Sequence, residues 1–130
     1  MENCIFCKIV AGEIPCFKVW EDDRFVAFLT IRPIREGHTL LIPKAHVEDV
    51  ISGDNETIAG TFVAAKHVAE VLKQTYGTPR VAMLVVGLEV PHLHVHLVPT
   101  SGMNDVDFSR VTDVSPDSLA AVAKKISGGM

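Results

Sequence analysis

The alternation of apolar and polar segments predicts three strands in the first third of the chain. Apolar and aromatic residues fill 17–20 and 25–29, and the polar run 21–24 between them is typical of a hairpin turn. A third apolar run, at 39–42, has the length of a strand and is closed by Pro43. We therefore expect a β-hairpin followed by one further strand.

The middle of the chain predicts one long helix. Between residues 56 and 76 the apolar residues recur mostly at spacings of three and four, as a buried helix stripe requires. They are Ile58, Phe62, Val63, Ala65, Val68, Ala69, Leu72 and Tyr76. Gly77 and Pro79 then predict the end of the helix, because glycine suits a C-terminal cap and proline cannot continue a helix.

Two further strands and a short helix complete the pattern. Apolar runs of strand length occupy 81–86 and 92–98, and Ser115 followed by Pro116 is typical of a helix start. Short connections between strands favour antiparallel pairing. The sequence thus predicts an α+β fold, with an antiparallel sheet of about five strands, one long helix, short terminal helices, and the helices on one side of the sheet. No repeat or linker divides residues 1–130, so a single domain is expected.

Composition and charge exclude several classes of protein. The 130 residues are 48% apolar and 22% charged, which is typical of one globular domain. A net charge of -4 does not provide the broad basic surface that a nucleic-acid polymer requires, although local donors can still bind the phosphate of a small nucleotide. Neither a membrane span nor a secretion signal is recognisable, so we expect a cytoplasmic protein without a membrane partner.

Histidine is the unusual residue in this composition. Three of the six histidines, His92, His94 and His96, alternate with apolar residues. On a strand, alternate side chains share a face, so the three imidazoles would line one side while the apolar residues between them pack on the other. The alternation therefore predicts a single polar site.

Three uses of this histidine row are open. The row can be the wet face of a half-exposed strand without a function, or its H-x-H pairs can chelate a metal, for which Glu89 is the only acid nearby. It can also carry a nucleophile with helpers, since much of the imidazole is neutral at pH 7 and a neighbouring histidine can supply or take a proton. Phosphorus is the electrophile that suits histidine, so this third use predicts covalent transfer at phosphorus without a catalytic metal.

Several motifs in order resemble the histidine triad (HIT) family of nucleotide hydrolases and transferases. The segment His92–Val98 matches the family's H-φ-H-φ-H-φ-φ signature, in which φ is apolar, and the likeness extends through 5–15, 25–28 and 37–46. The third histidine is similar to the hydrolase branches, and the short chain resembles the Hint-like branch with its small bacterial members. The resemblance implies a HIT-like fold, a small nucleotide substrate and a homodimer, in which the polar loop 100–113 could reach the partner's site.

The resemblance implies a role for each histidine of the motifs. His94 would attack the α-phosphorus of a nucleoside phosphoramidate or dinucleotide and form a nucleotidyl-histidine intermediate, which water then hydrolyses. His96 would contact the phosphoryl oxygens and help the leaving group depart, while His92 and His38 complete the polar relay behind them. His67, in the middle of the long helix, is expected on the surface. The alternative function is a non-catalytic module that binds a nucleotide, or a zinc-stabilised interaction module.

The resemblance also points to residues that contact the substrate. The apolar base pocket of the family corresponds to Phe6, Ile9, Ile14, Phe28 and Ile31. Thr30 stands where the family carries an aspartate that binds both ribose hydroxyls, and a threonine can make only one hydroxyl contact. Gly87 keeps the backbone freedom to approach phosphate. Glu89 either faces solvent or favours a substrate with a cationic leaving group.

The N-terminal cysteines give a separate prediction. Three cysteines, two of them spaced as Cys4-x-x-Cys7, do not fit a disulfide framework. Relatives with this pair are similar in binding structural zinc, which implies Cys4, Cys7, His46 and His92 as a closed set of four ligands. The alternative is two reduced thiols packed on the first helical turn, and Cys16 is expected to be such a thiol. If His92 binds zinc, it cannot also move protons.

Overall fold

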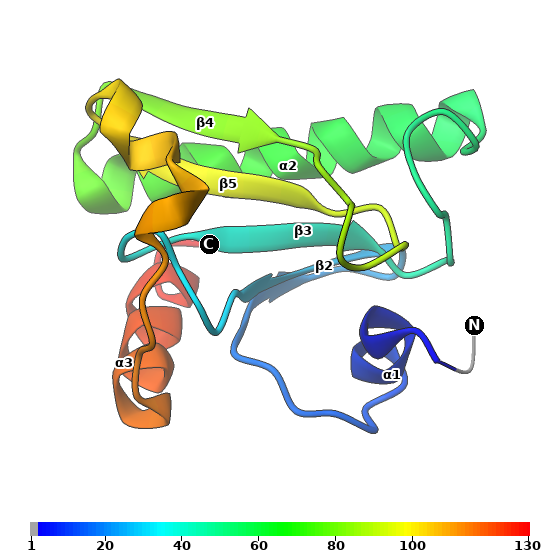
Figure 1. Cartoon of the computed structure of the whole chain (residues 1–130), viewed down its shortest axis with the longest axis horizontal. Helices are drawn as coiled ribbons and strands as arrows, with labels where there is room; N and C mark the ends of the chain where they lie inside the picture. Colours follow the sequence, from blue (N-terminus) through cyan, green and yellow to red (C-terminus); the bar gives the residue numbers. More distant parts are fainter. Residues whose placement is uncertain (1–2) are drawn as a thin grey trace.

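The computed structural model describes residues 3–130, all but the first two residues of the expected single domain, and contains one five-stranded sheet (Figure 1). The strands are β1 (Lys18–Glu21), β2 (Phe25–Leu29), β3 (Thr39–Pro43), β4 (Arg80–Leu84) and β5 (Val95–Thr100). Their order across the sheet is β1-β2-β3-β5-β4, and every neighbouring pair is antiparallel. The strands expected in the first third of the chain are confirmed within one residue at each end. The predicted α+β fold with an antiparallel sheet is therefore confirmed.

The helices begin and end where their capping residues predict. They are α1 (Ile5–Val10), α2 (Asn55–Tyr76) and α3 (Pro116–Ser127). The Asp54 carboxylate accepts a hydrogen bond from the Thr57 amide at 2.8 Å, which satisfies a free donor in the first turn of α2. Gly77 ends α2 with a φ of 63°, the left-handed conformation of a helix cap, and Ser115 caps the start of α3. None of the helices within residues 3–130 combines the length and the apolar character that crossing a bilayer needs.

The two faces of the sheet carry different layers. β2 is buried along its whole length, and its side chains alternate between the faces. Phe25 and Leu29 belong to the core under α2 and α3, whereas Val26 and Phe28 pack with α1 on the opposite face. The expectation that the helices cover one side only is therefore wrong for α1. Its buried Phe6 supplies the apolar contact that the second face needs.

The histidine row does not form one continuous strand. β5 begins at Val95, whereas the pattern predicted a strand from residue 92, and β4 likewise ends before its predicted position. Pro91 has no amide proton to offer a neighbouring strand. The Leu93 amide donates to the carbonyl of Val47 at 2.6 Å, in a loop outside the sheet. The first two histidines of the row therefore lie on the loop that leads into β5.

A segment without strands connects β5 to α3, and we call residues 101–113 the strap. It contains two short 3-10 helices, η1 (Met103–Val106) and η2 (Phe108–Arg110). The Thr112 amide donates to the Pro33 carbonyl at 3.1 Å, and Arg35 forms an ion pair with Asp105 at 2.6 Å. These contacts attach the strap to the loop between β2 and β3. Figure 1 shows the strap, in orange, passing this loop on its way to α3.

The approach to β3 depends on a glycine. Gly37 has a φ of 94°, and a Cβ at this position would lie 2.6 Å from Cε2 of Tyr76. We expect Gly37→Ala to destabilise the fold by about 2 kcal/mol, because it forces a left-handed backbone on alanine and displaces the tyrosine ring. Gly102→Ala is the matched control, since its backbone is extended and no atom lies within 4 Å of the added carbon. Urea unfolding measures the difference, and equal midpoints for the two variants would contradict the prediction.

Candidate functional site

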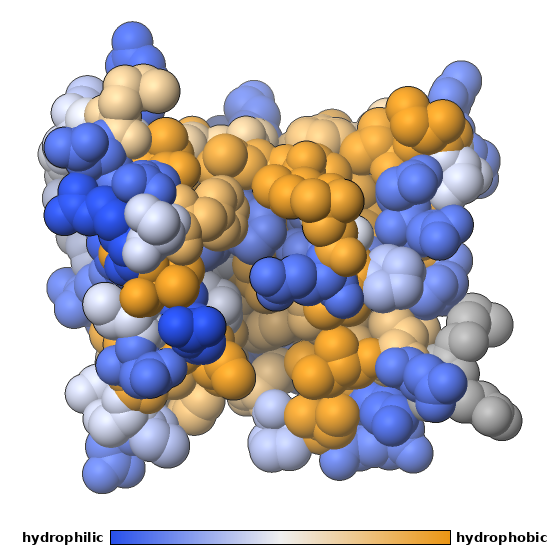
Figure 2. Space-filling model, viewed as in Figure 1, coloured by the Kyte–Doolittle hydropathy of each residue, from blue (hydrophilic) through white to orange (hydrophobic). Residues whose placement is uncertain are grey.

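A cavity of about 700 Å³ opens on the face of the sheet that carries α1. Its walls come from α1, β2, β3, the loop between β4 and β5, and the strap. Figure 2 shows this face hollowed near its middle, with apolar side chains gathered around the hollow. All residues expected to contact the substrate lie in its lining, namely Phe6, Ile9, Ile14, Phe28, Thr30, Ile31, Gly87 and Glu89.

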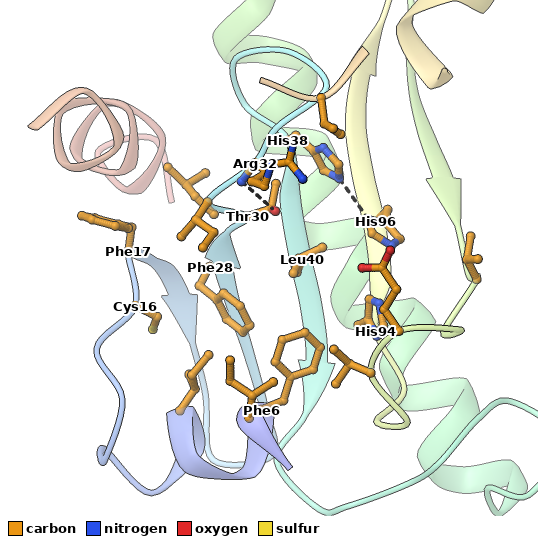
Figure 3. Close-up of a pocket in the computed structure, with 18 of the residues that line it drawn as sticks. Phe6, Cys16, Phe17, Phe28, Thr30, Arg32, His38, Leu40, His94 and His96 are labelled. Atoms are coloured by element: carbon orange, nitrogen blue, oxygen red, sulfur yellow. Dashed lines mark hydrogen bonds between the residues drawn. The ribbon is translucent and has the colours of Figure 1, made fainter. Parts of the chain in front are cut away.

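The apolar wall of the cavity is built around two phenylalanines. The buried rings of Phe6 and Phe28 meet edge to face with their centroids 5.6 Å apart. Figure 3 shows both rings on the wall that leads toward His94 and His96. Ile31 lies at the mouth of the cavity and is 67% exposed. An apolar wall with two aromatic rings suits the flat face of a nucleobase or another planar ring.

His94 lies in the cavity wall with one ring nitrogen committed to the backbone. Its Nδ1 is 2.7 Å from the carbonyl oxygen of His92. A carbonyl oxygen only accepts, so this contact assigns the proton of the neutral ring to Nδ1. Nε2 of His94 then carries a free lone pair, which is the form of imidazole that acts as a nucleophile.

His96 has the opposite assignment, through a chain of hydrogen bonds that starts at the backbone. The Ile34 amide donates to Nδ1 of His38 at 3.1 Å, so the proton of His38 resides on Nε2. Nε2 of His38 lies 3.0 Å from Nδ1 of His96 and donates to it (Figure 3). The proton of neutral His96 is therefore on its Nε2. The ring centroids of His94 and His96 lie 5.0 Å apart, so a ring with an acceptor nitrogen and a ring with a donor nitrogen are neighbours in the cavity wall.

Burial keeps the His38–His96 pair uncharged. Loss of hydration lowers the pKa of His38 to about 4. The same cause, with the nearby His94 and His38 as further contributions, lowers the pKa of His96 to about 3. Both rings are therefore neutral at physiological pH, and each can hold the tautomer that its partners select.

His92 is turned away from the cavity, which corrects the expectation that three imidazoles share one face. It is fully buried, and it is absent from the cavity lining that contains His38, His94 and His96. Its Nε2 donates to the carbonyl oxygen of Pro43 at 2.9 Å. The separation arises because residues 92–94 belong to a loop, in which alternate side chains need not point the same way.

The ring of His92 instead joins the two N-terminal cysteines. Its Nδ1 lies 3.3 Å from Sγ of Cys4 and 3.6 Å from Sγ of Cys7, and Nδ1 of His46 lies 3.2 Å from Sγ of Cys7. All four ligand atoms lie within 4.8 Å of one another. A tetrahedral zinc ion with ordinary bond lengths separates sulfur from nitrogen by about 3.5 Å, so this donor set fits the ion. The group contains His92 but neither His94 nor His96, so within residues 3–130 the histidines of the row divide between this cluster and the cavity.

The positions of Thr30 and Glu89 refine what was expected of them. The Thr30 hydroxyl accepts a hydrogen bond from the Arg32 amide at 3.3 Å, so it retains its proton as one donor toward the cavity. Arg32 also lines the cavity and forms an exposed ion pair with Asp113 at 3.3 Å. Glu89 is exposed to solvent and also lines the cavity. Facing solvent and lying near a bound substrate, which were expected as alternatives, are therefore compatible.

Sequence reasoning missed Phe108, an aromatic residue of the strap. Its ring centroid lies 4.9 Å from that of His96 and 6.1 Å from that of His38. The only signal in the sequence was a lone aromatic residue within a polar loop. The strap was expected to reach toward a partner, yet Phe108 and Val111 line the cavity of their own chain. Cys16 is a half-buried free thiol in the same wall, and His67 is exposed as expected.

Comparisons with known proteins point to one family. A sequence model described as the HIT domain matches residues 11–103. The adenosine 5'-monophosphoramidase of Saccharomyces cerevisiae is 40% identical over 128 residues, which cover 90% of this chain and 81% of the yeast protein. The structure of a HIT-like protein from Bartonella henselae superposes with a TM-score of 0.88 at 29% identity, covering 100% of this chain and 98% of that one. A zinc-bound histidine triad family protein from Mycobacterium smegmatis gives 0.84 at 28% identity, covering 98% and 93%.

The neutral His38–His96 pair makes the stability of the fold depend on pH. Both pKa values lie below the value of about 6.5 in an unfolded chain, so between pH 6.5 and about 4 the unfolded chain binds protons that the folded protein excludes. The contribution of the pair to the free energy of unfolding is fully present above about pH 6.5 and is lost as the pH falls toward the two lowered pKa values. His38→Gln should reduce this fall by up to about 1.4 kcal/mol per pH unit, the value of one proton.

Urea unfolding between pH 7 and 4.5 measures this slope. The exposed His67 supplies the control, because His67→Gln should keep the full slope. The group of Cys4, Cys7, His46 and His92 is intact in all three proteins, so it contributes equally to the pH dependence of each. A slope for His38→Gln equal to that of the unaltered protein would show that His38 does not resist protonation.

Proposed function

Because this chain belongs to the HIT family, we propose that it hydrolyses a nucleotide at its α-phosphate, as a phosphoramidase or dinucleotide hydrolase, through a covalent intermediate on His94. Members of the family act on small nucleotides, and the yeast relative that is 40% identical is named an adenosine 5'-monophosphoramidase. The observation that carries the proposal is the set of hydrogen bonds at His94, His38 and His96, which assigns opposite tautomers to His94 and His96.

The tautomers support different roles for the two rings, with His94 as the nucleophile and His96 as the hydrogen-bond donor. Nε2 of His94 attacks phosphorus, and the bond from phosphorus to the leaving nitrogen or oxygen breaks as the new bond forms. Nε2–H of His96 donates a hydrogen bond to the phosphoryl oxygen or the leaving atom, where negative charge accumulates. The leaving group takes the proton from Nε2 of His96 as it departs. Water then attacks phosphorus and the bond from Nε2 of His94 to phosphorus breaks, which frees His94; the hydroxyl of the water stays on phosphorus and its other proton returns to Nε2 of His96. His38 holds the tautomer of His96 from behind.

The cavity wall supports a nucleoside as the bound part of the substrate. The base would lie against Phe6 and Phe28, whose rings form the apolar wall next to His94. Thr30 offers one hydroxyl to the ribose. Glu89 adds a negative charge to the lining, which favours a leaving group that is itself cationic, such as an amine.

We also propose that a structural zinc ion binds at Cys4, Cys7, His46 and His92. The donor geometry fits the ion, and the related protein from Mycobacterium smegmatis is described as zinc-bound. Four protein ligands leave no open position, which suits a structural role more than a catalytic one. The Pro43 carbonyl accepts from the far nitrogen of His92 and orients that ring. With His92 committed to this cluster, His38 is the partner left to serve His96.

The edge of the sheet supports a homodimer. β4 is the last strand of the sheet and hydrogen-bonds to β5 alone among the strands of residues 3–130. Exposed apolar side chains occupy this edge and the start of the following loop, at Met83, Val85 and Val86. An open apolar edge is the surface on which another strand pairs, and a second copy of the chain offers an identical one.

Replacement of the nucleophile tests the catalytic proposal. His94→Ala should reduce turnover of an adenosine 5'-phosphoramidate about 10³-fold or more and leave the fold intact, because it removes the lone pair that attacks phosphorus. Mass spectrometry of the unaltered protein during turnover should find a nucleotide attached to His94. The control, His67→Ala, alters an exposed helix residue and should turn over normally. Tight nucleotide binding without turnover would instead support the non-catalytic module.

Metal analysis tests the zinc proposal. Protein purified without added zinc should contain about one zinc ion per chain, and Cys4→Ser should remove most of it and lower the thermal midpoint. Cys16→Ser changes a free thiol outside the cluster and should keep the full zinc content. A content near zero in the unaltered protein would refute the site and leave two reduced thiols at the start of α1.

A further inference from the structure

Phe108, an aromatic residue of the strap, packs against the ring of His96. The two rings stand edge to face, with centroids 4.9 Å apart and planes at 82°. The same ring meets His38 at 6.1 Å and 75°. His38 is buried and His96 is partly buried, and the half-buried ring of Phe108 contributes to this burial by contacting both. An edge-to-face contact also resists rotation of the ring that it packs against.

Hydrogen bonds and an ion pair hold the strap in the position that presents Phe108. The Asp105 carboxylate accepts from the Ser101 amide at 2.8 Å and from the Gly102 amide at 3.2 Å, and it pairs with Arg35 at 2.6 Å. The Asp107 carboxylate then accepts from the Ser109 amide at 2.9 Å and starts the short helix η2. These bonds fix the backbone on both sides of Phe108.

The loop that receives the strap also sets the tautomer of His38. Its Ile34 amide donates to Nδ1 of His38, and the His38 amide donates to the Arg35 carbonyl at 3.2 Å. The Thr112 amide binds the same loop at Pro33. The strap therefore acts on the histidine pair from two sides, through the ring of Phe108 and through the loop that orients His38.

We propose that Phe108 is a positioning residue for His96. The strap fixes the ring of Phe108 against that of His96, so that Nε2–H of His96 points toward the leaving group. This inference rests on the proposed hydrolysis at His94. Nδ1 of His96 is engaged by His38, so the orientation of the ring alone decides where its remaining N–H points. Excluding water from this hydrogen bond strengthens it, because it operates in a low-dielectric environment.

The role predicts a dependence on the leaving group. An alkylamine leaves phosphorus poorly and needs the hydrogen bond from His96, whereas 4-nitrophenolate leaves well without it. With adenosine as the common nucleoside, Phe108→Ala should lower kcat for the alkylamine phosphoramidate about 10- to 100-fold and for the 4-nitrophenyl ester less than about 3-fold. Phe108→Tyr keeps the ring and should restore the alkylamine reaction.

Val111→Ala is the matched control. Val111 lies on the same strap and lines the same cavity, but its aliphatic side chain has no ring with which to make the edge-to-face contact that Phe108 makes with His96. Its loss should raise KM for both substrates by a similar factor. Equal losses of kcat for both substrates with Phe108→Ala, or a change in KM alone, would show that Phe108 is only part of the cavity wall and would overturn the proposal.

A spectroscopic measurement separates this inference from the proposed function. Long-range proton–nitrogen NMR spectra of the full chain distinguish the two imidazole tautomers without any substrate. His96 should carry its proton on Nε2 in the unaltered protein and in Phe108→Tyr. In Phe108→Ala the His96 ring should exchange between more than one orientation or tautomer, which shifts or broadens its signals. Unchanged His96 signals in a folded Phe108→Ala would refute the positioning role. Failure of the unaltered protein to turn over either substrate would refute the hydrolase proposal, whatever the spectra show.

Discussion

The chemistry of the cavity depends on which backbone group each imidazole meets. A neutral imidazole has one proton for two nitrogens, so a backbone partner on one side decides the character of the other side. Nδ1 of His94 meets a carbonyl and must carry the proton, while Nδ1 of His38 meets an amide and must not. Rings with the same intrinsic basicity thereby differ, since one presents a bare nitrogen and the other an N–H. Burial lowers the pKa values of His38 and His96 and so keeps these two rings neutral, because a charged imidazole would carry protons on both nitrogens and lose the distinction.

The sheet brings these backbone groups together from distant parts of the chain. His38 lies directly before β3, and His96 lies on β5 opposite Leu40, its partner in the β3–β5 register. A shift of this register by one residue would turn His96 to the other face of the sheet. The β3–β5 pairing therefore does more than stabilise the core, since it also creates the hydrogen bond between the two histidines. Because His92 lies on the loop before β5 and not on the strand, its ring can turn away from the cavity and contact the cysteines.

Much of the fold and the cavity follows from local pattern, while the division among the histidines does not. Spacing alone locates α2 and β2, and the motif likeness identifies Phe6 and Phe28 as cavity residues. The alternation of histidines suggests one shared face, but the Leu93 amide bonds to a loop that is distant in sequence, and His92 leaves that face as a result. Phe108 depends in the same way on ion pairs and hydrogen bonds that fix the path of the strap. Such contacts between distant segments leave no periodic signal in a sequence.

Helix α1 joins the cysteine cluster to the cavity through one side chain. The ring of Phe6 lies 5.8 Å from that of His92 and 5.1 Å from that of His94, between the two sites. The cysteines of the cluster stand at the start of the same helix and on its first turn. An ion held there would immobilise the wall of the cavity that Phe6 forms, so occupation of the cysteine cluster and binding in the cavity would favour each other reciprocally.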